Sequence, residues 1–237
     1  MTVEYTRHLR ENGELMARAV ARDLDAHVPT CPEWNVAKLT IHTGQHHRWV
    51  ADAVSGGGEP PANPGKPGLR GDDLVAWFRD GWRDLADLLD ESDDETPAWS
   101  WSGDNRIGFW RRRTALETLV HRWDAENATG EGSPMDPELA SDGIDEMLFV
   151  FARDSSYSGP RGRSRIVTTD TPDSWTLDLE DGKVPVPTRS GEDVSAVTVG
   201  GRAEDVLLYL WGRKGADVVD VSGDEGLSAS FVRWLED

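Results

Sequence analysis

The chain has 237 residues, enough for a large hydrophobic core and for one or two domains. Its 44 acidic and 25 basic side chains leave a formal charge of −19, which repels nucleic acid phosphates and anionic lipids, so we expect neither nucleic acid nor a membrane as a partner. The single cysteine excludes an intramolecular disulfide framework. We expect a cytoplasmic protein, because the sequence has no apolar run of membrane-spanning length and no basic-then-apolar leader after Met1.

Apolar residues at helical spacing predict four helices in the first 130 residues. We expect helices over about 4–25 and 36–54, separated by a proline-bounded turn at 28–34. The segment 55–71, with three consecutive glycines and four prolines, is a long connection. A third helix starts at Asp72-Asp73, and a fourth runs from about Phe109 to Gly130 after an irregular acidic stretch. This order predicts a four-helix bundle with two long connections.

The pattern changes after residue 130. The sequence Asp136-Pro137-Glu138 is typical of a helix start, with aspartate as the cap and proline at the first helical position. Beyond that helix we expect strands near 166–169, 175–179 and 194–199, a helix over 203–213, a strand over 218–221 and a helix over 227–235. The sequence therefore predicts two domains, a helical bundle over 1–130 and a small α+β domain over 136–237.

Three side chains from the second and fourth helices form a candidate metal site. His42 lies on the apolar stripe of the second helix, and Glu117 and His121 share one face of the fourth because they are four residues apart. Alone, the Glu117–His121 pair would be an ordinary surface contact worth a few tenths of a kcal/mol. Together the three suit Zn²⁺ or a similar divalent ion and leave a fourth coordination position open, which favours catalysis.

Several neighbouring residues are candidates for supporting roles. His46 is four residues from His42, so it is either a fourth ligand or a group that lines the cofactor pocket. Asp124 could orient His121, hold a substrate or coordinate directly, and we favour the first of these. The arginines at 111–113 read most simply as a solvated helix start, although one could face an anionic substrate. Cys31 is expected to be structural, because nearby Glu33 would raise its pKa.

The motifs around these residues resemble those of the mycothiol-dependent maleylpyruvate isomerase family, which belongs to the DinB-like metal-binding helical bundles. The matching segments of the first domain are 28–36, 47–49 and 121–126. Segments 173–175 and 207–213 are similar to the family's C-terminal domain, itself similar to sterol-carrier domains. The resemblance implies a DinB-like four-helix bundle followed by a sterol-carrier-like α+β domain.

The same resemblance implies roles for individual residues. It makes His42, Glu117 and His121 the metal ligands, and it suggests that Arg213 reaches the active site and clamps a substrate carboxylate. We assign Asp124 and Arg213 to catalysis and His46 to cofactor binding. The expected cofactors are a divalent metal, most simply Zn²⁺, and mycothiol as the thiol co-substrate. The other partner is a small electrophile, and we expect a monomer or weak homodimer.

These observations predict a metal-dependent isomerase or S-transferase that activates a low-molecular-weight thiol. Two alternatives stay open at this stage. One is a hydrolase that uses metal-bound water, with His46 or Asp124 as general base. The other is a non-catalytic small-molecule-binding protein with a structural metal. A structural zinc is normally closed by a fourth protein ligand, so the number of ligands separates the enzyme from the binding protein.

Overall fold

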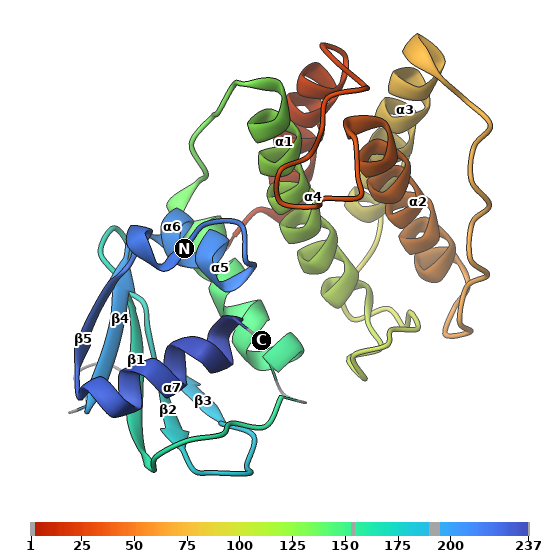
Figure 1. Cartoon of the computed structure of the whole chain (residues 1–237). Helices are drawn as coiled ribbons and strands as arrows, with labels where there is room; N and C mark the ends of the chain where they lie inside the picture. The colour runs from red at the N-terminus through yellow and green to blue at the C-terminus, as the bar shows by residue number, and fades with distance from the viewer. Residues whose placement is uncertain (1–2, 153–154, 190–194, 237) are drawn as a thin grey trace. The chain divides into compact units, whose positions relative to one another are not determined.

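A computed structural model of the chain describes residues 3–152, 155–189 and 195–236 (Figure 1). The chain divides into two compact units, Met1–Ser133 and Pro134–Asp237. The first is helical, and the second combines helices with a five-stranded sheet. The predicted fold class, a four-helix bundle followed by a small α+β domain, is confirmed. Among the described residues, no helix is long and apolar enough to cross a membrane.

Four helices build the first unit: α1 (Tyr5–Val20), α2 (Val36–Ser55), α3 (Gly71–Asp90) and α4 (Ile107–Thr129). Helix α1 packs against α3 and α4, and α2 packs against the same two helices (Figure 1). The core between them is apolar and includes Leu9, Met16, Leu39, Val50, Phe78, Leu85, Trp110 and Leu119. Contact between α2 and α4 is what brings the two halves of the candidate metal site together.

Helix α1 is shorter than predicted, because it ends at Val20 and not near residue 25. The Asp23 side chain accepts hydrogen bonds from the backbone N–H groups of Asp25 and Ala26, at 2.9 and 3.1 Å. Such a side-chain-to-backbone turn competes with continued helix. Helix α2 begins where predicted, and the Asn35 side chain caps it by accepting from the Lys38 N–H at 3.0 Å.

Glycines let tryptophans of α3 lie close to the backbones of its neighbours. A Cβ atom on Gly44 of α2 would lie 2.2 Å from the ring of Trp77, and one on Gly13 of α1 would lie 2.7 Å from that of Trp82. Neither ring could stay in place against an alanine, since overpacking a core typically costs about 1–3 kcal/mol. The Gly44–Trp77 approach sets α2, the helix that carries His42, against α3, and the Gly13–Trp82 approach does the same for α1.

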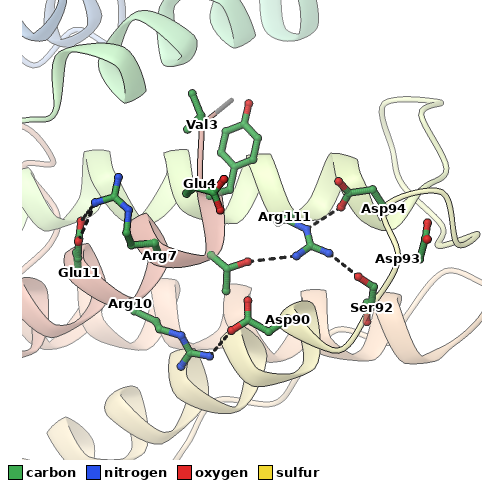
Figure 2. Close-up of a pocket in the computed structure, with 12 residues that line it drawn as sticks. Val3, Glu4, Arg7, Arg10, Glu11, Asp90, Ser92, Asp93, Asp94 and Arg111 are labelled. Carbon is green, nitrogen blue, oxygen red and sulfur yellow. Dashed lines mark hydrogen bonds and ion pairs between the residues drawn. The ribbon is translucent and has the colours of Figure 1, made fainter. Parts of the chain in front are cut away.

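Arg111 ties the start of α4 to the rest of the bundle. It borders an open cleft of about 720 Å³ formed by the first turns of α1, the end of α3 and the following loop (Figure 2). Its guanidinium donates to the Asp94 carboxylate at 2.7 Å, to the Ser92 carbonyl at 2.8 Å and to the Thr6 hydroxyl at 3.3 Å (Figure 2). The expectation of a solvated arginine was therefore wrong here, because Arg111 joins three segments of the unit.

The second unit opens with α5 (Pro137–Glu146), which Asp136 caps by accepting from the Leu139 N–H at 3.0 Å. A short π-helix, η1 (Met147–Phe151), continues it. The sheet has the strand order β3-β2-β1-β4-β5, in which only β1 and β4 run parallel. Its strands are β1 (Gly162–Thr168), β2 (Ser174–Leu179), β3 (Pro187–Arg189), β4 (Val197–Gly201) and β5 (Asp220–Gly223).

Two helices and a short turn complete the second unit: α6 (Ala203–Leu210), the 3₁₀ turn η3 (Ala216–Val218) and α7 (Glu225–Glu236). Helix α7 lies across the sheet, where Leu227 fills the space above Gly162 (Figure 1). Strand β3 was not predicted, and β5 begins two residues later than expected, after η3. The first residue of the strand expected at 194–199 lies outside the described residues.

Candidate metal centre

Side chains of α2 and α4 converge on one point of the bundle. The Nε2 atom of His42 lies 3.4 Å from Oε1 of Glu117, and Nε2 of His121 lies 3.1 Å from the same oxygen. The ligand atoms of all three residues lie within 4.8 Å of one another. In the described part of the chain, no other cluster of three or more histidine, cysteine or acidic side chains has this geometry.

The spacing of these atoms fits a small divalent ion. Two atoms bound to one zinc ion at about 2.1 Å and at a tetrahedral angle lie roughly 3.4 Å apart. The His42–Glu117 and His121–Glu117 distances of 3.4 and 3.1 Å are close to that value. Two imidazoles and a carboxylate are also the donor types that zinc accepts in catalytic sites. The three residues therefore fit the metal that the sequence predicts.

The hydrogen bond between His121 and Asp124 is compatible with this assignment. Its Nδ1 lies 2.9 Å from Oδ2 of Asp124, whose carboxylate is fully buried. A carboxylate accepts, so Nδ1 donates, and the lone pair of neutral His121 then lies on Nε2. That lone pair faces the Glu117 carboxylate oxygen at 3.1 Å. Such a contact is attractive only if a proton or a metal cation lies between the two atoms.

His42 is the ligand that faces outward. Its side chain is 45% exposed, whereas the side chains of Glu117 and His121 are 15% and 9% exposed. The desolvation of its ring, together with the neighbouring His121, lowers the pKa of His42 to about 4. The imidazole is therefore neutral at pH 7 and keeps a lone pair for a metal. Exposure on the His42 side gives a small molecule access to the site.

Arg113 holds the other oxygen of Glu117. Its buried guanidinium donates to Oε2, while Oε1 faces the two imidazoles. This division favours Glu117 as a ligand through one oxygen, with its second oxygen neutralised by a fixed cation. The expectation that the arginines at 111–113 form a solvated helix start was wrong for Arg113 as well. Its distance of four residues from Glu117 was a usable signal, because that spacing joins side chains on one helix face.

His46 lies one turn further along α2 but outside the metal-ligand group. Its ring contacts those of Trp49 and Trp110, with both centroid distances at 6.5 Å. Burial lowers the pKa of His46 well below its usual value, and its buried Nε2 has no hydrogen-bond partner in the described part of the chain. A neutral imidazole with an unused polar atom suits a pocket-lining role. The neighbouring His47 is fully buried, and its Nε2 lies 2.9 Å from the Thr118 hydroxyl.

Arg213 belongs to the second unit and follows a turn at Gly212, where φ is +65°. Its guanidinium donates to the Trp211 carbonyl at 2.7 Å and lies 5.9 Å from the centre of the Trp211 ring. These two contacts place the guanidinium beside the backbone and the ring of Trp211. The substrate-binding role of Arg213 stays a prediction.

Thr30 is a site residue that the sequence did not suggest. It lies in the loop between α1 and α2, and its hydroxyl donates to Oδ1 of Asp124 at 2.7 Å. The same loop carries Trp34, whose ring lies 5.0 Å from that of His42. The loop motif contributed to the family resemblance. However, no local pattern links a threonine to an aspartate 94 residues away.

The fold and the site define the class of protein. A four-helix bundle with two imidazoles and a carboxylate on facing helices, followed by a small α+β unit, is a two-domain protein with a candidate metal centre in its bundle. Residues 6–126 match the family model for the mycothiol maleylpyruvate isomerase N-terminal domain, and residues 138–230 match the model for its C-terminal domain. The chain belongs to the mycothiol maleylpyruvate isomerase family, which confirms the resemblance found in its motifs.

Solved structures agree with this assignment at the level of the fold. The crystal structure of the mycothiol-dependent maleylpyruvate isomerase is 14% identical, covers 92% of each chain and has a TM-score of 0.65. A histidine-to-alanine mutant of a mycothiol-dependent maleylpyruvate isomerase gives the same coverage and TM-score at 13% identity. No curated protein matches the sequence significantly. At such identities the structures show a shared fold, and the activity of this chain is a separate question.

Removing any one of the three predicted ligands should remove most of the bound metal. We expect the purified protein to carry roughly one divalent ion per chain, and His42→Ala, Glu117→Ala and His121→Ala each to lose most of it. Elemental analysis of the folded variants measures this. Glu138→Ala, which removes an exposed carboxylate from α5, is the control. His46→Gln should keep its metal, and full occupancy in Glu117→Ala would contradict the site.

Proposed function

We propose that the protein is a metal-dependent enzyme that activates a low-molecular-weight thiol, mycothiol, for addition to an electrophilic small molecule. The observation that carries this proposal is the convergence of His42, Glu117 and His121, with His42 partly exposed. A group of three ligands leaves a coordination position for a substrate, whereas a structural zinc would be closed by a fourth. The family assignment supplies the thiol as the expected co-substrate.

We assign the chain's own residues separate roles in binding the metal and orienting its ligands. His42, Glu117 and His121 hold a divalent ion, most simply Zn²⁺, and a zinc ion there would lower the pKa of a coordinated thiol. Asp124 keeps the Nδ1 proton of His121 in place, so that Nε2 remains a ligand atom. Arg113 compensates the charge of Glu117 and holds it in one orientation.

The reaction of the thiolate with the small molecule has two outcomes, depending on which kind of electrophile the small molecule is. With a cis-configured enedione acid, its sulfur adds to one carbon of the double bond and the electron pair moves onto the conjugated carbonyl. Rotation about the new single bond and elimination of the thiolate then give the trans acid, without net consumption of thiol. With an epoxide, the sulfur opens the ring, the C–O bond breaks and the resulting alkoxide takes up a proton. With a carbon that bears a leaving group, the sulfur displaces that group, which departs with its bonding electron pair, and with either electrophile the product is a thiol conjugate. The protein is thus an isomerase in the first case and an S-transferase in the second.

Two further residues are proposed to contact the small molecules. His46 offers a neutral imidazole whose Nε2 is without a hydrogen-bond partner among the described residues, so it suits a polar group of the thiol cofactor. Arg213 offers a guanidinium that suits a substrate carboxylate, because the planar fork can bond both carboxylate oxygens.

Cobalt substitution tests whether the thiol binds the metal. In the cobalt-loaded protein, mycothiol should produce an intense sulfur-to-metal charge-transfer band, with an apparent thiol pKa well below its free value of about 8.5. Absorption spectra recorded across a pH titration measure both. The His121→Ala variant should give no such band. If no thiol changes the spectrum while a hydrolysable substrate is turned over, the protein is a hydrolase. If neither occurs, a binding protein is the better account.

Loss of the Arg213 guanidinium should weaken binding of an acidic substrate. A hydrogen bond to a charged group contributes about 1.5–3 kcal/mol, so Arg213→Gln should raise KM roughly ten- to hundredfold and leave the metal content unchanged. Steady-state kinetics with a carboxylate-bearing electrophile and with its ester measure the difference. Arg202→Gln, the same change at a side chain that is 64% exposed, is the control. Equal KM values for the wild type and Arg213→Gln would show that Arg213 does not bind the substrate carboxylate.

A further inference from the structure

We propose that Thr30 is a positioning residue for the metal centre, acting through Asp124 on the ligand His121. This inference rests on the proposed metal-binding function. Thr30 Oγ1 donates to Oδ1 of Asp124 at 2.7 Å, and Oδ2 of the same carboxylate accepts from Nδ1 of His121 at 2.9 Å. One hydroxyl on a loop thereby orients one oxygen of a carboxylate on α4, and the other oxygen of that carboxylate orients the imidazole.

The loop that carries Thr30 is held by its own backbone hydrogen bonds. The N–H of Val28 donates to the Trp34 carbonyl at 3.0 Å, and that of Val36 donates to the Ala26 carbonyl at 2.9 Å. Inside this closed loop the Cys31 and Trp34 N–H groups donate to the Val28 and Cys31 carbonyls. Thr30 is therefore carried by a fixed support, which a positioning residue requires.

The same loop contacts the second histidine of the centre. The Trp34 ring lies 5.0 Å from the ring of His42 at an angle of 52°. Segment 28–34 thus touches one imidazole ligand directly and the other through Asp124. The two histidines lie on different helices, α2 and α4, so this one loop is linked to a ligand on each helix.

The energetic consequence follows from the burial of Asp124. Its side chain is fully buried, so a donor taken from its carboxylate cannot simply be replaced by bulk water. A carboxylate that has lost this bond is held less firmly, and His121 then loses part of the support for the tautomer and ring orientation that metal binding needs. Removing such an outer partner typically weakens metal affinity about ten- to hundredfold.

A purely structural role for Thr30 makes a different prediction. In that case Thr30→Val would lower the melting temperature and leave the zinc affinity of the folded protein unchanged. A positioning role requires that zinc affinity falls and that a hydroxyl restores it. Zinc affinity is therefore the informative readout, and it does not depend on any catalytic activity.

The test is a zinc titration of metal-free full-length protein against a chromophoric chelator. Thr30→Val, which keeps the shape of the side chain and removes the hydroxyl, should bind zinc about ten- to hundredfold more weakly. Thr30→Ser should stay near wild type. Thr129→Val is the matched control, because the Thr129 hydroxyl bonds only backbone carbonyls of α4, among the contacts described. Thr30→Ala replaces Thr30→Val if the valine variant does not fold.

The outcomes separate this inference from the proposed function. Weak zinc binding by Thr30→Val, with near wild-type binding by Thr30→Ser and Thr129→Val, supports the positioning role. Wild-type affinity in Thr30→Val or Thr30→Ala overturns it, while the metal site and the thiol chemistry stand. A wild-type protein that binds no zinc overturns both.

Discussion

The candidate metal centre depends on one contact, in which two imidazole nitrogens meet at a single carboxylate oxygen. Nε2 of His42 and Nε2 of His121 lie 3.4 and 3.1 Å from Oε1 of Glu117. With the Nδ1 proton of His121 donated to Asp124, a divalent metal between the three ligand atoms, or protons on the Nε2 atoms, makes this arrangement attractive. The buried Arg113 bonds the other oxygen of Glu117, so that Oε1 is left to face the two imidazoles. The bundle thus provides a geometry that a divalent metal would complete.

Much of the first unit can be understood from the need to hold α2 and α4 in place. The close approach of Gly44 to Trp77 sets α2 against α3, and Arg111 anchors the start of α4 to the loop after α3. The loop between α1 and α2 then reaches both histidines, through Trp34 and Thr30. Apolar packing places the helices close enough for their side chains to meet. The polar contacts then set the exact positions of the side chains in the site. Catalytic sites generally need that precision.

The sequence predicted the elements whose signals are local. Helix α2 begins and ends within one residue of the prediction, because Asn35 caps it and its apolar spacing is regular. The end of α1 was missed, since Asp23 starts a turn that the apolar pattern does not show. Strand β3 was missed because proline argues against a strand. Yet β3 is an edge strand, where a proline that lacks its N–H is tolerated.

The same division holds for the site. Spacing within one helix suggested Glu117 with His121, and it could have suggested Arg113 with Glu117. The hydrogen bond from Thr30 to Asp124 could not be predicted, because it depends on how a loop folds against a helix 94 residues later. No regular spacing in the sequence marks residues that act through tertiary contacts, so they are identified only from the structure.

X-ray absorption at the zinc edge, with and without mycothiol, tests the central claim most directly. The account predicts two imidazoles and oxygen ligands at about 2.0–2.2 Å in the zinc protein alone, and one added sulfur at about 2.3 Å when mycothiol is present. The account would be contradicted if the spectrum showed no sulfur ligand at saturating mycothiol. It would also be contradicted if four protein ligands already coordinated the zinc before mycothiol was added.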